Sequence, residues 1–260
     1  MAVTHSAKPE DITVFYWAFS PWASKVTAYL ALRRLPHAEC DQPITLPRPD
    51  LAALGVRYRR IPVVAIGRDV FCDTLCVLEA LERYFPPSSA VSSGRSGSSG
   101  AGAASDGVAN NNGGAHAAHP SLAAPDAAGA ALTRLLEKWT DVAVFKHAAD
   151  AIPSSLPLCQ DPAFVKDRTE LWGYEWTPAA QDARRPKGLA NLRAHFDLLE
   201  DLLADGRRWL LGADGPLLAD IHGTFSAAAA CCCSLLLGGV VRPTGGAARE
   251  RHEADARAFL

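Results

Sequence analysis

The sequence predicts an α/β domain with the element order βαβαββα and a four-stranded sheet, followed by an all-helical domain. Three observations lead to this prediction. Apolar runs typical of strands alternate with segments of helical periodicity as far as residue 85. Between residues 88 and 119 the composition changes, because 26 of these 32 residues are Ser, Gly, Ala or Asn. Beyond residue 130 apolar residues recur only at helical spacing.

The first strand is predicted from Ile12 to Trp17, where β-branched and aromatic residues form one run. A helix is expected directly after it. Ser20 is a favourable N-cap and Pro21 a favourable first helical residue, and an apolar stripe then continues to Arg34. This order, strand then helix, opens the α/β domain.

The middle of the domain is predicted to hold a second strand over residues 38–42 and a short helix that ends at Gly55. Two further strands, Val63 to Ile66 and Val70 to Cys72, are separated by Gly67, Arg68 and Asp69, which suit a hairpin turn. We therefore expect these two strands to pair antiparallel.

The last helix of this domain is predicted from Thr74 to Tyr84, with Asp73 as its N-cap. The low-complexity composition that follows cannot bury enough apolar surface to offset its chain entropy. We therefore divide the chain into a domain at 1–87, a flexible linker at 88–129 and a helical domain at 130–260.

Two amphipathic helices are predicted in the second half, around Leu132–Phe145 and Leu189–Leu203. The segment from Ile221 to Val241 has no Lys, Arg, Asp or Glu over its 21 residues, which is nearly the length of a membrane span. Much of it is Ala, Gly, Ser and Cys, and it contains His222. A buried helix of the second domain is the favoured interpretation.

The composition argues against several partners. A net charge of -2 and a pI near 6.4 do not provide the positive surface that nucleic acids require. The first residues lack the features of a secretory signal, so a cytoplasmic location is expected, with no membrane partner. The seven cysteines show no disulfide framework or zinc-like spacing, and the His116 and His119 pair lies in the low-complexity stretch, so we expect reduced thiols and no metal.

Three strings of the sequence, together with the element order, resemble glutathione transferases. The strings are FYWAFSPWASKV, RYRRIPVVAIGRDVFCDT and WLLGADGPLLADIH. The resemblance implies a thioredoxin-like N-terminal domain with a mixed sheet and an all-helical C-terminal domain. The Ser-type and omega-like members are the most similar, because a strand is followed by Ser and then Pro.

Ser20 is the first catalytic candidate. In the resembled family a hydroxyl at this helix start donates a hydrogen bond to the sulfur of glutathione and keeps it a thiolate. Lowering a thiol pKa from about 8.5 to about 6.5 requires about 2.7 kcal/mol. A hydrogen bond to a charged group supplies about 1.5 to 3 kcal/mol and a helix N-terminus about 0.3 to 1 kcal/mol. The alternative is that Ser20 only caps the helix. Tyr16 is the second catalytic candidate, and its alternative role is packing within the strand.

The resemblance also implies residues that bind the rest of glutathione. Pro62 matches the cis-proline of the fold, which leaves the Ile61 backbone to pair with the cysteinyl unit. Asp73 and Thr74 match the pair that binds the γ-glutamyl end, and Arg60 is expected to meet the glycyl carboxylate. Without the resemblance, Pro62 would be interpreted as a trans proline of an edge strand, Asp73 as a helix cap and Arg60 as a solvated surface arginine.

The sequence departs from the family in the helical domain. Leu217 stands where a Ser or Thr usually begins a capping box, although Asp220 is still expected to accept a backbone N–H. The chain ends soon after a Gly-rich tail, so the helical domain is expected to be incomplete. The aromatic residues Trp172, Tyr174 and Trp176 either wall a pocket for a second substrate or anchor a loop.

We therefore expect a glutathione transferase-like enzyme that uses glutathione as co-substrate and conjugates it to a small electrophile. The alternative is a non-catalytic binding or interaction protein that kept the fold. Reduction of disulfides or peroxides is disfavoured, because no Cys lies between Trp17 and Ser24. A homodimer is suggested by the resemblance alone.

Overall fold

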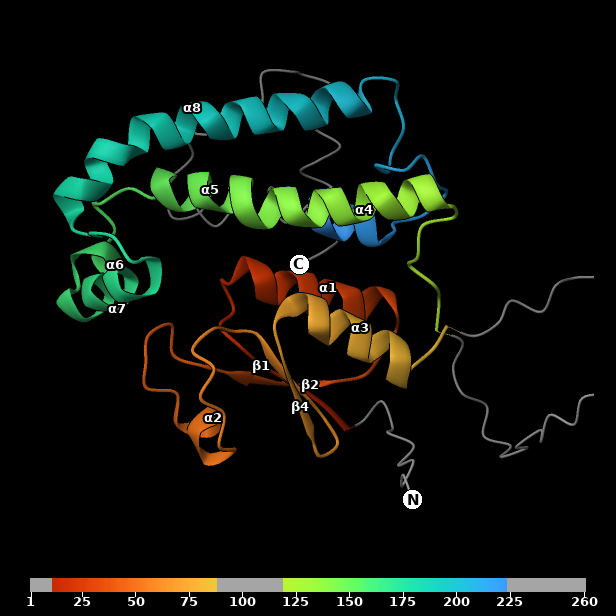
Figure 1. Cartoon of the computed structure of the whole chain (residues 1–260), viewed down its shortest axis with the longest axis horizontal. Helices are drawn as coiled ribbons and strands as arrows, with labels where there is room; N and C mark the ends of the chain where they lie inside the picture. The colour runs from red at the N-terminus through yellow and green to blue at the C-terminus, as the bar shows by residue number, and fades with distance from the viewer. Residues whose placement is uncertain (1–10, 88–118, 224–260) are drawn as a thin grey trace, which may run out of the picture.

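The computed structural model describes residues 11–87 and 119–223 (Figure 1). Its N-terminal part is a mixed four-stranded sheet with helices on both faces, and its C-terminal part is helical, which confirms the predicted fold class. The helical part lies on the side of the sheet that carries α1 (Pro21–Leu32) and α3 (Thr74–Tyr84).

The sheet has the strand order β2-β1-β3-β4. The strand β1 pairs parallel with β2 and antiparallel with β3, which in turn pairs antiparallel with β4. The hairpin of β3 and β4 is therefore as predicted. The strands are β1 (Ile12–Tyr16), β2 (Ala38–Asp41), β3 (Val63–Ile66) and β4 (Asp69–Cys72).

Two hydrophobic clusters hold the sheet between its helices. The larger cluster joins α1 and α3 to one face, where Val14, Val26 and Leu81 are fully buried. On the other face, Leu51 of the short helix α2 (Pro49–Ala53) packs against Phe15 and Val63. This arrangement follows from the alternation of β1, whose successive side chains point to opposite faces.

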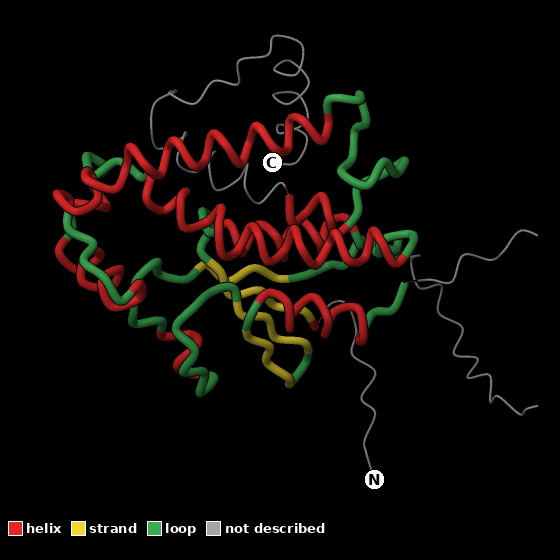
Figure 2. Tube along the Cα trace, turned by 45° about the horizontal axis from the view of Figure 1, so that its top comes forward, coloured by secondary structure: helices red, strands yellow, loops and turns green. Residues whose placement is uncertain are grey.

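The helical part is built on two long antiparallel rods. Figures 1 and 2 show α4, η2 and α5 following one another as one rod, with α8 running beside it. The bounds are α4 (Ala127–Trp139), the π-helical turn η2 (Thr140–Val144), α5 (Phe145–Ala151), α6 (Pro157–Gln160), α7 (Pro162–Trp172) and α8 (Pro178–Leu203). A side chain at Gly188 of α8 would come within 2.9 Å of Asp150, so the rods approach closely there.

The structure describes residues 119–129, which the prediction placed in the linker at 88–129. The helix α4 already begins at Ala127, and Leu122 is buried in the cluster between α1 and α3. The Leu122 carbonyl accepts a 2.8 Å hydrogen bond from Leu218. One large apolar side chain among small residues therefore ties this segment to the N-terminal domain.

The start of the helical turn that follows Leu217 confirms another expectation. Asp220 accepts hydrogen bonds from the Leu217 N–H at 2.8 Å and from the Leu210 N–H at 2.7 Å. Burial raises the pKa of the Asp220 carboxyl, and both backbone bonds oppose that rise. The carboxylate thus caps the helix although the expected hydroxyl is missing.

Some expectations concern residues outside the described ranges. These are the uncharged segment beyond residue 223, the adjacent cysteines at 231–233 and His116. Among the helices of 11–87 and 119–223, none is long and apolar enough to cross a membrane.

Candidate functional site at one end of the sheet

Three loops meet at one end of the sheet. Phe15 of β1 pairs with Val63 of β3, and Val63 pairs with Cys72 of β4, so these residues form one row across the sheet. The chain leaves β1 beyond this row toward Ser20, enters β3 through Pro62 and leaves β4 at Asp73. The register thus brings together most of the residues predicted for the glutathione site.

Ser20 is the N-cap of α1, as predicted. Its side chain accepts a 3.4 Å hydrogen bond from the Ala23 N–H, and the residue is only 5% exposed. Among the described residues, no group accepts the proton of the Ser20 hydroxyl. The hydroxyl therefore keeps its donor for a ligand at the positive end of α1.

Tyr16 uses its hydroxyl differently. The phenol of this β1 residue donates to Oε2 of Glu39 on the neighbouring strand β2, at 2.5 Å. This hydrogen bond, together with burial, raises the pKa of Tyr16 to about 12. A proton already shared with a carboxylate is poorly placed to stabilise a thiolate, so Ser20 is the better placed of the two candidates.

The peptide bond between Ile61 and Pro62 is cis, as the resemblance implied. Neither the N–H nor the C=O of Ile61 has a hydrogen-bond partner in the part of the chain that the structure describes. The residue is half-buried, and both backbone groups are thus left for an extended peptide to pair with.

Asp73 is the N-cap of α3 and has an unusual backbone conformation. Its φ is 73° and its ψ is 131°, and its Oδ1 accepts a 3.0 Å hydrogen bond from the Leu75 N–H. Residues other than glycine rarely adopt such angles, and they concentrate at functional sites. The Thr74 N–H and hydroxyl have no partner among the described residues, so they can bind a carboxylate at this helix start.

The arginines before Pro62 have different roles. Arg59 donates to Oδ1 of Asp167 on α7 at 3.0 Å, which ties this loop to the helical part. Arg60 is exposed, as its predicted role requires.

The sequence analysis did not identify Tyr58, whose phenol is half-buried beside these groups. Burial raises the pKa of Tyr58, the negative charge of Asp73 adds to this rise, and the positive charge of Arg60 opposes it. No motif marks Tyr58.

An aromatic row begins in the first turn of α1. The ring centroid of Trp22 lies 3.8 Å from that of Phe145, and Phe145 stacks on Trp172 of α7 at 5.5 Å. Tyr174 continues the row at 5.8 Å from Trp172, whereas Trp176 is 2% exposed and packs in the core around α6 and α7. Trp172 and Tyr174 are partly buried and pack against the same cluster, in which Trp176 is the fully buried anchor.

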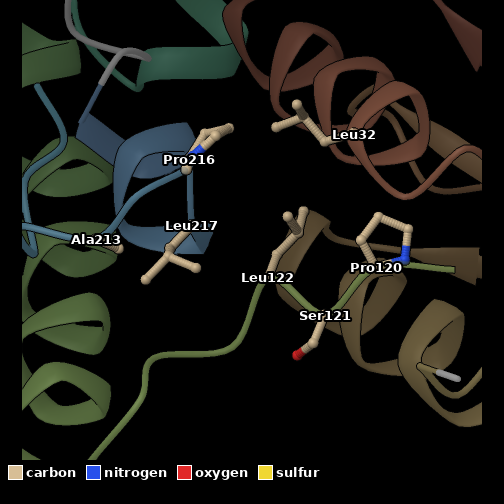
Figure 3. Close-up of a pocket in the computed structure, with 8 residues that line it drawn as sticks. Leu32, Pro120, Ser121, Leu122, Ala213, Pro216 and Leu217 are labelled. Carbon is tan, nitrogen blue, oxygen red and sulfur yellow. The ribbon is translucent and has the colours of Figure 1, made fainter. Parts of the chain in front are cut away.

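Two cavities are lined by none of the residues predicted to bind glutathione, although Tyr58 lines the second. One, of about 350 Å³, is lined by the end of α1 and by two loops (Figure 3). The other, of about 330 Å³, lies along α2 between Leu46 and Tyr58. Neither Ser20 nor Asp73 lines them. Within the described ranges, no three His, Cys, Asp or Glu side chains are grouped to hold a metal ion.

Two family profiles match the sequence. The glutathione S-transferase N-terminal domain matches residues 14–89, and a domain of unknown function matches residues 147–228. No curated protein matches the sequence significantly.

Solved structures with the same fold include enzymes of several kinds. A tau class glutathione S-transferase from mango is 13% identical, with a TM-score of 0.55 over 96% of this chain and 88% of that one. A glutathione S-transferase from Rhodospirillum rubrum is 19% identical, with a TM-score of 0.52 over 89% and 94%. A beta-etherase from Sphingobium is 16% identical, with a TM-score of 0.52 over 90% and 86%.

The N-terminal part is therefore similar to the glutathione S-transferase N-terminal domain, and the described chain has the fold of the glutathione S-transferases, a thioredoxin-like domain followed by a helical one. The first of the two profiles covers all three loops at the end of the sheet. At these levels of identity the solved structures establish the fold, and the activity has to be argued from the site.

Proposed function

We propose that the protein binds glutathione at this end of the sheet and activates its sulfur as a thiolate through Ser20. One observation carries the proposal: the strand register brings Ser20, the Ile61 backbone and Asp73 with Thr74 to the same end of the sheet. Each of these segments has hydrogen-bonding groups that no described residue uses.

The tripeptide fits the site by its chemistry. The cysteinyl unit pairs with the N–H and C=O of Ile61, as an added strand does. The γ-glutamyl carboxylate binds the free N–H and hydroxyl of Thr74 at the start of α3, and its ammonium group pairs with the Asp73 carboxylate. The exposed Arg60 is available to the glycyl carboxylate.

The energy that Ser20 supplies matches what a thiolate needs. A charge-assisted hydrogen bond contributes about 1.5 to 3 kcal/mol, and the start of α1 contributes about 0.3 to 1 kcal/mol. Lowering the pKa of a thiol by about two units requires about 2.7 kcal/mol, which these two contributions together can supply. The burial of Ser20 favours the upper part of these ranges, because a charge is less screened in a medium of low dielectric constant.

The second substrate is proposed to be a small apolar electrophile. The aromatic row of Trp22, Phe145 and Trp172 runs from the first turn of α1 and provides flat apolar surface. The thiolate attacks the electrophilic carbon, forms a carbon–sulfur bond and expels the leaving group, or opens a strained ring.

A homodimer belongs to the same proposal. Leu135 of α4 and Val142 of η2 are 66% and 67% exposed although both are large apolar residues. Such exposed side chains are typical of interfaces between chains. We expect Leu135→Lys to shift the sedimentation of the protein toward the monomer, and an unchanged dimer would place the interface elsewhere.

The test of the proposed function is a calorimetric titration of the full chain with glutathione, alongside a conjugation assay with an aromatic halide. We expect saturable binding, and for Ser20→Ala a conjugation rate lowered by about 10- to 100-fold with little change in binding. Absence of binding to the parent chain would reject the proposal. Binding without turnover of any electrophile would support the non-catalytic alternative.

A further inference from the structure

Asp141 joins the helical part to the first turns of α1. Its Oδ1 accepts a 2.7 Å hydrogen bond from Nζ of Lys25 and a 3.3 Å hydrogen bond from Nε1 of Trp22. The two donors are three residues apart, so they lie on one face of α1, directly after Ser20. One carboxylate of the C-terminal domain thus holds the turn that carries the proposed catalytic hydroxyl.

The pairing of Lys25 with Asp141 is buried on the α1 side. Lys25 is 2% exposed, and the side chain of Asp141 is 27% exposed. An ammonium group so deeply buried requires a carboxylate in fixed geometry, because an unpaired charge in the interior is costly. Burial lowers the pKa of Lys25, and the charge and hydrogen bond of Asp141 oppose this shift.

Asp141 lies in the π-helical turn η2. Five residues, from Thr140 to Val144, adopt this wider turn between α4 and α5. Both Asp141 and, four residues later, Phe145 contact Trp22, one through the indole N–H and the other through the ring face. Single π-helical turns inside α-helices are frequent at functional sites. Two residues of one rod, four positions apart, thus contact the same side chain of α1.

Other charged groups face the same interface. Glu137 of α4 lies one turn before Asp141 and interacts with its carboxylate. His222 is 2% exposed and is influenced by the charges of Lys25 and Asp141, and its Nδ1 has no hydrogen-bond partner among the described residues. The interface thus concentrates polar groups beside the apolar cluster that packs against α1.

We propose that Asp141 is a positioning residue, which fixes the first turn of α1 from the helical domain and so aims the Ser20 hydroxyl at the bound sulfur. This rests on the proposed function of Ser20. It goes beyond that function, because it assigns part of the thiolate site to a residue of the other domain that does not touch glutathione.

The experiment compares Asp141→Asn and Asp141→Glu with the parent chain. The matched control is Glu79→Gln, which removes an ion pair that also joins the two domains, between Glu79 and Arg134 at 3.0 Å, but is about 60% exposed on both sides. The readouts are glutathione affinity by calorimetry and the pKa of the bound thiol, followed by the ultraviolet absorbance of the thiolate across pH.

For Asp141→Asn we expect the pKa of the bound thiol to rise by about one unit and kcat at neutral pH to fall about tenfold. The KM for glutathione should change less than about threefold. Asp141→Glu should restore most of the loss, and Glu79→Gln should behave as the parent chain. An unchanged thiol pKa in Asp141→Asn, or an equal effect in Glu79→Gln, overturns the proposal.

A second variant covers the case in which Asp141→Asn does not fold. Lys25→Met combined with Asp141→Leu replaces the buried ion pair by apolar groups, which proteins often tolerate. This double variant should also show the raised thiol pKa, and a parent-like value overturns the proposal. If the parent chain binds no glutathione, the proposed function fails as well, whereas a parent chain that binds and an unaffected Asp141→Asn reject the positioning role alone.

Discussion

The backbone of Asp73 allows its strain and its capping role to be separated. With a φ of 73° and a ψ of 131°, a residue with a Cβ costs about 1 to 3 kcal/mol at this position. The hydrogen bond from the Leu75 N–H to its carboxylate stabilises the start of α3 by about 1 kcal/mol. Asp73→Ala loses the cap and keeps the strain, so we expect the free energy of unfolding to fall by about 1 kcal/mol.

Asp73→Gly should behave in the opposite way. Glycine adopts this conformation freely and is a tolerable N-cap, so the relief of strain offsets the lost hydrogen bond and the greater entropy of the unfolded chain. We expect the glycine variant to be about 1 to 2 kcal/mol more stable than the alanine variant. Asp73→Asn, which keeps a capping oxygen and tolerates the backbone, should match the parent within about 0.5 kcal/mol.

The assay is urea unfolding followed by tryptophan fluorescence, with glutathione calorimetry on the same samples. All three variants lose the carboxylate that pairs with the ligand's ammonium group, so the affinity should fall about 10- to 100-fold in each. An alanine variant as stable as the glycine variant would refute the strain argument. A glycine variant of parental affinity would remove Asp73 from the binding site.

Three further predictions concern other parts of the structure. Tyr16→Phe should leave the conjugation rate within about twofold of the parent, because the phenol donates to Glu39, and a loss as large as that of Ser20→Ala would move the catalytic role to Tyr16. Gly188→Ala should lower the free energy of unfolding by about 1 to 3 kcal/mol, since the new Cβ would lie 2.9 Å from Asp150; an unchanged urea midpoint would contradict this close contact. Burial lowers the pKa of His222 to about 3, so the unfolded state binds more protons between pH 3 and the ordinary value of about 6.5, and stability falls as the pH decreases through this range. From pH 7 to pH 5 the loss due to His222 should be about 2 kcal/mol, measured by urea unfolding, and His222→Asn should remove this part of the pH dependence.

The fold was predictable from the sequence because its signals are local. The serine and proline at the start of α1, the Gly67 turn and the capping Asp73 each act within a few residues of the chain. Apolar periodicity then indicates which side of each element is buried. The helices α6 and α7 and the early start of α4 were not anticipated. Pro157 and Pro162 interrupt the apolar pattern of the first two, and the first turns of α4 consist of Ala and Gly, which carry no apolar periodicity.

Part of the candidate site was also predictable. The cis bond before Pro62 and the capping positions of Ser20 and Asp73 are as expected, because they belong to motifs that the sequence carries in single strings. Tyr58 was missed, because nothing in its neighbours distinguishes a phenol at a ligand site from one in a loop. The roles of all these residues in binding glutathione stay predictions.

The sequence by itself determined the order of the elements in the N-terminal domain and the capping roles of Ser20 and Asp73. Only the tertiary structure decided which polar groups face one another: the phenol of Tyr16 binds Glu39, Arg59 binds Asp167, and Lys25 binds Asp141. The latter two partners are more than 100 residues apart in the chain. Capping and periodicity depend on neighbours in sequence, whereas a buried charge takes whichever partner the packing of helices brings within hydrogen-bond distance.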